Sequence, residues 1–427
     1  MYFIDKNRNC IVPGCLLFSE MDIAEVRNKV GQLALKKGKQ NFRRTVKCFL
    51  GEYYWHKELS PEQLDLKQHI YDSTSGRTFE DMKQLGDYTA SKLNLPMDLN
   101  KPLWDMEVFH GVFGNNCAVV VRLHHCIGDG ISVLISLLEN ADDYKGIIQK
   151  MPKPASFLFK IAFILGFPLL FLSFLWKNAT FALSKADDNI LKREKNTYIS
   201  HASISERFPL EKLKMVGKKL KVTINEFLTG VIMLGMREYF EENKDGKVIE
   251  NSIQMIFPAS IREELAPNSE IEVNNRVSGI TLQCSLPPIQ NVLEDGIKLM
   301  IQLKHKTKPL KNTIMPIVAF SILEITMRLF PSFLVTPAFS LADKCSFIFT
   351  NIAASKQQLH FNSTVLKEIF LFVPNFGNIS VGVGVISYGE GIRITANSDL
   401  NSMKNPHQFI QIIEKFMKQY LEAYASD

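Results

Sequence analysis

The sequence has few cysteines, and they follow no recognisable pattern. The seven are Cys10, Cys15, Cys48, Cys117, Cys126, Cys284 and Cys345. Their number is odd, and no pair or Cys/His cluster has the spacing of a disulfide framework or a zinc site. Without such a cluster we expect no structural metal. Scattered cysteines of this kind are typical of a protein in a reducing compartment. Residues 1–18 also lack a basic stretch followed by an apolar core, so we expect no secretory signal.

Charge is also sparse. Only 22% of the residues are charged, the net charge is +6, and no dense Lys/Arg stripe occurs. The sequence therefore argues against a nucleic-acid partner. The mild positive charge would suit an anionic ligand or an anionic membrane face, but an ordinary solvated surface has the same composition.

Two catalytic motifs are missing as well. No glycine-rich phosphate loop is present, which argues against nucleotide hydrolysis. No Gly-x-Ser-x-Gly elbow is present either, so a serine acyl-enzyme has no support.

Apolar residues, by contrast, are abundant. They make up 46% of the 427 residues, and 30 of these are phenylalanine. A chain of this length exceeds one ordinary core, so two domains are the default. The polar stretch 185–200 looks like a linker, which predicts an N-terminal lobe over 1–184 and a C-terminal lobe over 185–427. Both mix helical and strand patterns, so the expected class is α/β (α+β).

The spacing of apolar residues predicts the main elements. In the first lobe these are a strand over Ile11–Ser19 interrupted near Pro13-Gly14, helices over 21–37 and 81–93, a central strand over 117–123, and a helix over 131–138. In the second lobe they are helices over 211–219, 223–240, 314–330 and 407–424, and strands over 253–257, 346–350, 367–373, 379–388 and 392–399. Thr223 and Glu226 have the spacing of a capping box.

Residues 155–176 form an apolar run in which Lys160 is the only charge. A spanning helix needs about 20 apolar residues. The uninterrupted part, 161–176, is shorter and carries Gly166 and Pro168 in its middle. We therefore predict a shallow hairpin or an interfacial helix that contacts a membrane. A buried interdomain helix is the alternative.

The strongest chemical signal is the segment His124-His125-Cys-Ile-Gly-Asp129-Gly130. It follows the apolar strand 117–123 and precedes a helix, so its polar groups would face a cleft at a strand-to-helix turn. Neutral imidazole can remove a hydroxyl proton near pH 7. Asp129 can fix the geometry of the turn by an ion pair or by binding backbone amides, and Gly130 keeps the helix start free of a side chain.

This segment resembles the HHxxxDG signature of CoA-dependent acyltransferases and peptide-synthetase condensation domains. The chain as a whole, from about residue 10 to 420, resembles the wax ester synthase/diacylglycerol acyltransferase family. The further segments that carry this resemblance are Pro102-Leu103-Trp104, Thr223-Ile224-Asn225-Glu226, Pro258-Ala259-Ser260-Ile261-Arg262, Asn274-Asn275-Arg276, and the block from Phe349 through Ser387-Tyr388 to Asp399. The family pattern has Asp in place of Glu226, Gly in place of Asn274, and a Gly-Pro turn after Asn351 that this sequence lacks.

The resemblance implies roles for the matched residues. His125 would be the general base, with His124 beside it, and Asp129 would be structural or orienting. Pro102, Leu103 and Trp104 would line the substrate channel together with Gly130, and Asn225 would lie near the reacting groups. From the residues alone, Trp104 is better explained as a packing residue than as a substrate contact, and Asn225 is equally well explained as a helix-start residue.

The resemblance also implies a fold and a reaction. The fold would be two chloramphenicol-acetyltransferase-like lobes with a tunnel at their interface. The reaction would move a fatty acyl group from acyl-CoA, as substrate and with no further cofactor, to a long-chain alcohol or diacylglycerol. The protein would then be membrane-associated, at the endoplasmic reticulum, a lipid droplet or the inner face of the plasma membrane. The alternatives are a condensation-type acyltransferase on the same fold and a catalytically inactive lipid-binding or scaffold protein.

Overall fold

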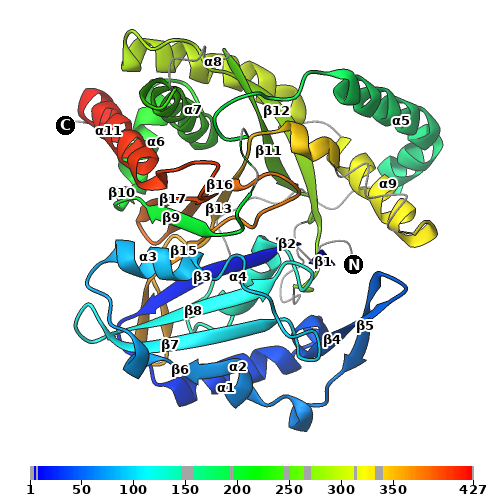
Figure 1. Cartoon of the computed structure of the whole chain (residues 1–427), viewed down its shortest axis with the longest axis vertical. Coiled ribbons are helices and arrows are strands. Elements are labelled where there is room, and N and C mark those ends of the chain that lie inside the picture. The colour runs from blue at the N-terminus through cyan, green and yellow to red at the C-terminus, as the bar shows by residue number, and fades with distance from the viewer. Residues whose placement is uncertain are drawn as a thin grey trace.

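The structure is a computed structural model of the chain. It describes residues 4–5, 8–145, 157–192, 194, 196–244, 251–263, 271–311, 315–331 and 340–425. Two lobes, each built on one large sheet, lie one above the other in Figure 1, with the N-terminal part of the chain, drawn in blue to cyan, below. Small antiparallel pairs, β1 (Ile4–Asp5) with β2 (Arg8–Asn9) and β4 (Arg44–Phe49) with β5 (Glu52–Glu58), lie outside these sheets.

The first lobe contains a six-stranded sheet of order β14-β15-β3-β8-β7-β6. Its strands are β3 (Ile11–Phe18), β6 (Ile70–Asp72), β7 (Trp104–Val112), β8 (Asn116–His124), β14 (Leu359–Phe361) and β15 (Thr364–Leu371). Its helices are α1 (Ile23–Leu35), α2 (Leu66–His69), α3 (Met82–Ala90) and α4 (Gly130–Leu138).

Strand β8 is buried on both faces, as its continuous apolar sequence predicts. Val119 and Val121 pack in the core beneath α1 and α4, whereas Ala118 and Val120 pack in a second core with α3. This alternation follows from the two-residue period of a strand. The buried strand fixes the position of His124 at its end.

The second lobe is built on a sheet of order β10-β17-β16-β13-β11-β12, with β9 paired to β17. Its strands are β9 (Ser200–Ile204), β10 (Phe208–Pro209), β11 (Ser252–Ser260), β12 (Val277–Ser285), β13 (Phe347–Ala353), β16 (Val381–Tyr388) and β17 (Gly391–Asp399). Its helices α6 (Leu210–Lys219), α7 (Ile224–Glu242), α8 (Val292–Lys311) and α11 (Pro406–Ala425) share the main core of this lobe. The predicted capping box at Thr223 is confirmed, with Thr223 and Glu226 bonding each other's backbone amides.

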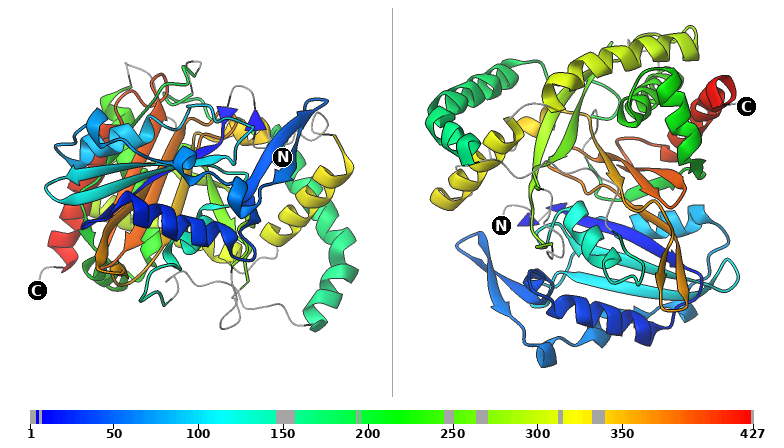
Figure 2. Two further views of the ribbon diagram at one scale, coloured as in Figure 1. Left: turned by 90° about the horizontal axis from the view of Figure 1, so that it is seen from below. Right: turned by 180° about the vertical axis from the view of Figure 1, so that it is seen from behind.

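The second half of the sequence contributes a hairpin to the sheet of the first lobe. Strands β14 and β15, from the second half of the sequence, complete the first sheet, where β15 pairs with β3 (Figure 2, right). Tyr388 of β16 holds this hairpin: its hydroxyl donates to the Leu366 carbonyl and accepts from the Leu359 amide, both at 2.8 Å. The predicted lobe boundary between residues 184 and 185 does not account for this crossing of β14 and β15 into the first sheet.

The predicted break of the first strand near Pro13-Gly14 is wrong, because β3 runs unbroken from Ile11 to Phe18. The Pro13 carbonyl accepts a hydrogen bond from the amide of Phe372, just beyond the last β15 residue that pairs with β3. Both main-chain groups of an extended residue face the same side. The N–H that Pro13 lacks would also face the β15 side, where the pairing of β3 with β15 ends. Its absence therefore removes no hydrogen bond between β3 and β8.

The apolar run is one helix, α5 (Phe157–Leu183), so the predicted hairpin is wrong. Pro168 lies inside this helix without ending it. The buried alternative is also wrong, because no residue of Phe163–Leu183 is buried. This segment has a mean hydropathy of 1.4 and is the one described helix long and apolar enough to cross a membrane. Residues 155 and 156 lie outside the described residues.

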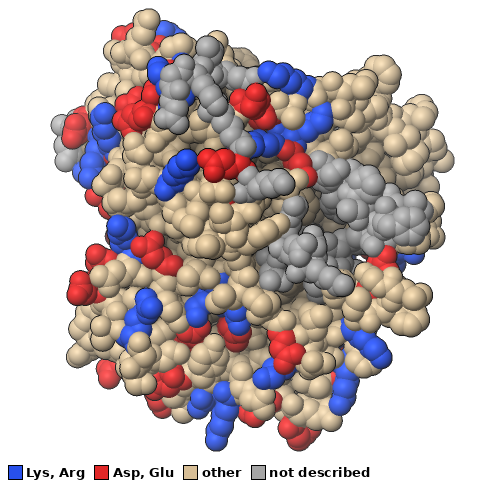
Figure 3. All heavy atoms as spheres, viewed as in Figure 1, with Lys and Arg blue, Asp and Glu red and all other residues tan. Residues whose placement is uncertain are grey.

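Helix α9 (Met315–Leu329) lies alongside α5, and both project from the second lobe in Figures 1 and 2. The part of the surface where α5 lies is almost free of charged atoms in Figure 3. Exposed apolar side chains of the pair include Ile164, Leu165, Leu169, Leu172 and Trp176 on α5 and Ile317, Ile325 and Leu329 on α9. The pair therefore presents a large apolar surface to the surroundings.

Candidate active site

The HHxxxDG segment lies where β8 meets α4, and the backbone fixes both histidines. The amide of His124 donates to the carbonyl of Leu103 at 2.9 Å, and the amide of His125 donates to the carbonyl of Cys10 at 2.8 Å. The chain then turns, and α4 begins at Gly130 with Asp129 as its N-cap residue. A rigid strand end thus presents the His125 imidazole to the space between the lobes.

The two histidines have different surroundings. His124 is 3% exposed, and its Nδ1 atom accepts a hydrogen bond from the Cys126 amide at 3.1 Å. This bond leaves the ring proton on Nε2 and keeps His124 inside the turn. His125 is only partly buried and lines a cavity between the lobes. His125 is therefore the histidine that a substrate can reach.

The cavity at His125 has a volume of about 550 Å³ and is mainly apolar. The first lobe contributes His125, Asp129 and Gly130, and the second lobe contributes strand residues such as Ile256 and Asn351. Helices α5 and α9 close its other end with Phe174, Lys177, Asn178, Phe181, Pro316, Ala319 and Leu323. We call this space the interlobe cavity. It occupies the place that the sequence predicted for a tunnel.

Burial lowers the pKa of His125 below its usual value of 6.5, because the charged imidazolium loses hydration. The charge of Asp129 and a hydrogen bond with the Asn275 side chain act in the opposite direction, but they do not outweigh desolvation. His125 is therefore neutral at pH 7, the form that can accept a proton.

Asp129 joins the two lobes. One carboxylate oxygen caps α4 by accepting from the Ser132 amide at 2.9 Å. The other accepts from Nη2 of Arg262 and from the Arg276 amide, each at 2.8 Å. Asp129 and Arg262 are both almost fully buried. This arrangement fits the orienting role that the sequence predicted for Asp129.

Gly130 lies in the wall of the interlobe cavity at the first residue of α4. A side chain at this position would meet Cδ1 of Ile352, from the second lobe, at 3.2 Å. The glycine therefore lets strand β13 approach the start of α4.

The Pro102-Leu103-Trp104 segment supports β8 and is not in the wall of the interlobe cavity. Leu103 accepts the hydrogen bond from His124, and Trp104 pairs with Leu123 of β8. The Trp104 indole is 1% exposed, stacks on His69 at 4.5 Å, and donates to the Phe42 carbonyl at 2.8 Å. The segment therefore packs around the strand that bears the histidines, and its channel-lining role stays a prediction.

Asn225 does not line the interlobe cavity, although it touches a residue that does. It lies in the first turn of α7, is exposed, and accepts a hydrogen bond from Nδ2 of Asn351 at 2.5 Å. Asn351 is in the cavity wall. This position is compatible with both interpretations of Asn225, as a residue that starts the helix and as a residue near the reacting groups.

Two residues near His125 were not among the predicted site residues. Nδ2 of Asn275 donates to the main-chain carbonyl of His125 at 2.8 Å, and Arg262 pairs with Asp129. Both lie in segments that carry the family resemblance. Sequence alone gave no reason to place them beside the histidines, because they come from the other lobe, more than 130 positions away along the chain.

Neither thiol near His125 is activated. Burial raises the pKa of Cys10 to about 12 and raises that of Cys126 further. A nucleophilic cysteine needs a lowered pKa to form its thiolate. The site therefore fits direct transfer rather than an acyl-cysteine.

Two family models match this sequence. Residues 22–156 match the wax ester synthase/diacylglycerol acyltransferase catalytic domain, and residues 275–420 match the WS/DGAT C-terminal domain. The chain belongs to the wax ester synthase/diacylglycerol acyltransferase (WS/DGAT) family. It is therefore an acyltransferase of that family.

Relatives of known sequence agree with this assignment. Wax ester synthase/diacylglycerol acyltransferase 2 of Arabidopsis thaliana is 22% identical over 394 residues, which cover 85% of this chain and 82% of the relative. A putative diacylglycerol O-acyltransferase of Mycobacterium bovis is 31% identical over 108 residues, or 24% of this chain and 19% of that protein.

Solved structures confirm the fold. The wax ester synthase/diacylglycerol acyltransferase from Marinobacter aquaeolei VT8 superposes with a TM-score of 0.66 at 15% identity, covering 100% of this chain and 97% of that one. The first condensation domain of the CDA synthetase gives a TM-score of 0.57 at 12% identity, with coverage of 99% and 92%. The mixed α/β fold of two chloramphenicol-acetyltransferase-like lobes, predicted from the resemblance, is thus the fold of this WS/DGAT chain.

Proposed function

We propose that this WS/DGAT chain transfers a fatty acyl group from acyl-CoA to the hydroxyl of a lipid alcohol, either a long-chain alcohol or diacylglycerol. The observation that carries the proposal is the position of His125. A neutral imidazole lies in the wall of a large, mainly apolar interlobe cavity, where a hydroxyl and a thioester can meet away from water.

The reaction is a direct displacement. The acceptor oxygen attacks the thioester carbonyl carbon while His125 takes the hydroxyl proton. The tetrahedral oxyanion collapses, the carbon–sulfur bond breaks, and the CoA sulfur leaves with the proton from His125. Hydrogen-bond donors must stabilise the oxyanion. Asn351, in the cavity wall, and its partner Asn225 are the candidates we favour.

The same proposal includes contact with a lipid surface. Lipid acceptors are insoluble, and α5 and α9 combine an exposed apolar face with side chains that close one end of the interlobe cavity. Insertion of such a face into a bilayer is favourable at about 0.8 kcal/mol per buried CH₂. A protein held there receives its acceptor from the membrane or from a lipid droplet.

The test is lipid analysis in a host that lacks neutral lipids. Wild-type protein should produce wax esters when a long-chain alcohol is supplied, or triacylglycerol without it, and His125→Ala protein at equal abundance should produce neither. Absence of both esters with wild-type protein, together with retained binding of acyl-CoA, would instead support the catalytically inactive lipid-binding alternative.

A further inference from the structure

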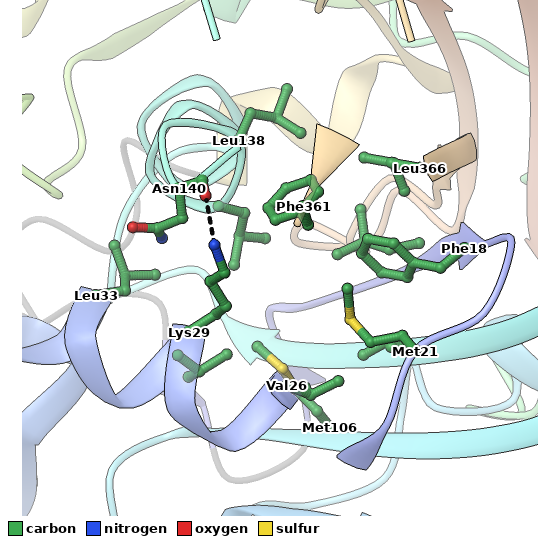
Figure 4. A pocket seen from close by; sticks show the side chains of 14 residues that line it. Phe18, Met21, Val26, Lys29, Leu33, Met106, Leu138, Asn140, Phe361 and Leu366 are labelled. Carbon is green, nitrogen blue, oxygen red and sulfur yellow. Dashed lines mark hydrogen bonds between the residues drawn. The ribbon is translucent and has the colours of Figure 1, made fainter. Parts of the chain in front are cut away.

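Most large apolar side chains of the first lobe are packed in its interior. Between α1, α4 and the β14–β15 hairpin, for example, Phe18, Val26 and Phe361 converge around a space of only about 50 Å³ (Figure 4). The β4–β5 hairpin differs, because the apolar side chains at its tip are exposed. Single exposed apolar residues are ordinary, whereas a group of them on one projecting element indicates a contact surface.

Three large apolar side chains lie near the turn of this hairpin. Phe49 is 63% exposed, Leu50 is 87% exposed and Tyr54 is 54% exposed. The hairpin projects to the same side of the molecule as α5 and α9 in Figure 1 and in both views of Figure 2. The exposed leucines Leu35 and Leu95 lie elsewhere on the first lobe. The tip of the hairpin is therefore an apolar group that faces the same surroundings as the α5–α9 pair.

The turn at this tip contains a residue that the turn disfavours. Phe49 pairs with Glu52, so Leu50 and Gly51 form a two-residue turn, in which their φ angles are 50° and 80°. A turn with positive φ at both positions favours Asn, Asp or Gly at the first, because a larger side chain crowds the backbone there. The Leu50 side chain also gains almost no burial in the folded chain. Folding alone therefore does not explain a leucine at this position.

The other end of the hairpin is firmly attached to the first lobe. Val46 is part of the main core of this lobe, and Trp55 packs against that core. Arg43 and Arg44 both form ion pairs with Glu58, at 2.7 and 3.2 Å. These contacts hold the hairpin in a projecting position, so its tip is presented at a fixed place.

The charges of the hairpin suit a surface of anionic lipid. Lys47 and Lys57 are exposed on its two strands and make no ion pair within the part of the chain that the structure describes. Glu58 is already paired with two arginines, and Glu52 is partly buried. On a membrane, apolar side chains enter the boundary of the hydrocarbon while lysines stay among the head groups. The hairpin therefore combines an apolar tip with cations along its strands.

We propose that the tip of the β4–β5 hairpin is a second lipid contact, which inserts Phe49, Leu50 and Tyr54 into a lipid surface that carries anionic head groups. This inference extends the lipid contact proposed for α5 and α9, which belong to the second lobe, to a contact made by the first lobe. Two contacts, one from each lobe, fix the orientation of the protein on the surface. They keep the end of the interlobe cavity that α5 and α9 close against the lipid.

Leu50→Asn is the sharpest test, because it removes the apolar side chain and supplies a residue that the turn favours. The Tm should stay the same or rise, whereas the affinity for vesicles of phosphatidylcholine and phosphatidylserine should fall about tenfold in co-sedimentation. Leu95→Asn removes an exposed leucine elsewhere on the first lobe and is the matched control, with unchanged affinity expected. A lower Tm would show that Leu50 serves folding, and an unchanged affinity would show that it meets no lipid. Either result for Leu50→Asn overturns the inference.

Lys47→Gln tests the choice of an anionic surface. The affinity for vesicles that contain phosphatidylserine should fall about fivefold, because one lysine near such a surface contributes about that factor. The affinity for vesicles of phosphatidylcholine alone should not change. Equal affinities of wild-type and Lys47→Gln protein for the vesicles with phosphatidylserine would overturn this part of the inference.

Cys48 can report the position of the tip directly. Of the seven cysteines, Cys48 is exposed and the other six are buried, so a bimane dye can be attached to it in the wild-type chain. Vesicles with nitroxide-labelled acyl chains should quench the dye, and Leu50→Asn should weaken the quenching. Vesicle binding by the wild-type protein without quenching at Cys48 would reject the hairpin contact. That result would leave the proposed reaction and the α5–α9 contact intact.

A second copy of the chain is the alternative occupant of the tip. In that case the bimane signal should change with protein concentration in the absence of vesicles, and sedimentation velocity should show a dimer that Leu50→Asn weakens. This result would overturn the lipid contact. A signal that is independent of protein concentration and is quenched by the labelled vesicles supports it.

Discussion

The two ends of the interlobe cavity are built differently. At the His125 end the wall residues His125 and Asp129 are held from behind by buried polar groups of the other lobe: Arg262 pairs with Asp129, and Asn275 donates to the His125 carbonyl. At the other end the wall consists of α5 and α9, whose outer faces are exposed and apolar. Catalysis needs a fixed geometry for proton transfer, whereas an insoluble substrate needs an apolar entrance. The comparison indicates that rigidity and access are assigned to separate parts of the cavity wall.

The strongest way to break the comparison is to remove the proposed base from the rigid end. We expect His125→Ala to lower kcat by about 10²–10⁴-fold, the usual contribution of general-base catalysis. His124→Ala, which removes a histidine inside the turn, should lower kcat less in protein that remains folded. Steady-state kinetics with palmitoyl-CoA and a long-chain alcohol provide the measurement, and unchanged kcat in folded His125→Ala protein would refute the mechanism.

The Asp129–Arg262 pair tests whether the rigid end also carries stability. Asp129→Asn or Arg262→Met should each cost about 3–5 kcal/mol of unfolding free energy, because each leaves a buried partner uncompensated. The double variant should cost less than the sum of the two. The exposed Arg328–Glu324 pair on α9 offers a control, since Arg328→Met should change stability by at most about 1 kcal/mol in urea titrations. Additive losses at Asp129 and Arg262 would show that the pair does not couple the lobes.

The apolar end is tested by making α5 polar. Ile164, Leu165, Leu169 and Leu172 are all exposed, and changing the four to serine should lower binding to phosphatidylcholine vesicles containing diacylglycerol at least tenfold. Co-sedimentation measures this. Leu35→Ser combined with Leu95→Ser removes exposed leucines outside α5 and should not change binding. Full vesicle binding by the α5 variant would move the lipid contact elsewhere.

The smallest expected effect concerns pH. Because the pKa of His125 is lowered, kcat/KM should stay constant near neutral pH and fall on the acid side with a midpoint below 6.5, where the imidazole becomes protonated. The bond to Asn275 raises this pKa, so Asn275→Ala should move the midpoint to lower pH. Asn275→Asp places a negative charge beside the ring and should move it to higher pH. Identical acid limbs in all three proteins would assign the titration to another group.

The sequence pattern correctly predicted those elements that depend on contacts between residues close together in the chain. The apolar strand before His124, the capping box at Thr223 and the helix over Pro406–Ala425 follow from periodicity and side-chain capping, and the structure contains them. The β12 strand and helix α8 were not predicted, although both pack in the second lobe. The expected break at Gly166 and Pro168 failed because local signals do not show when a helix continues through a proline.

The site was only half predictable for a similar reason. His125 and Asp129 lie in one short segment, so the sequence alone pointed to them. Arg262 and Asn275 reach them from the other lobe, and only the folded chain shows that contact. Trp104 lies in a motif for which the family resemblance implies substrate contact. In the structure its indole packs around β8, against His69 and the Phe42 carbonyl.

The β14–β15 hairpin, which comes late in the sequence, has a consequence for synthesis of the chain. The edge of β3 that pairs with β15 has no partner until residues 364–371 have left the ribosome, long after the rest of the first sheet has been made. An unpaired strand edge is a template for association with other chains. Nascent chains should therefore depend on chaperones through most of translation. A fragment ending near residue 184 should aggregate, although it contains the whole HHxxxDG segment.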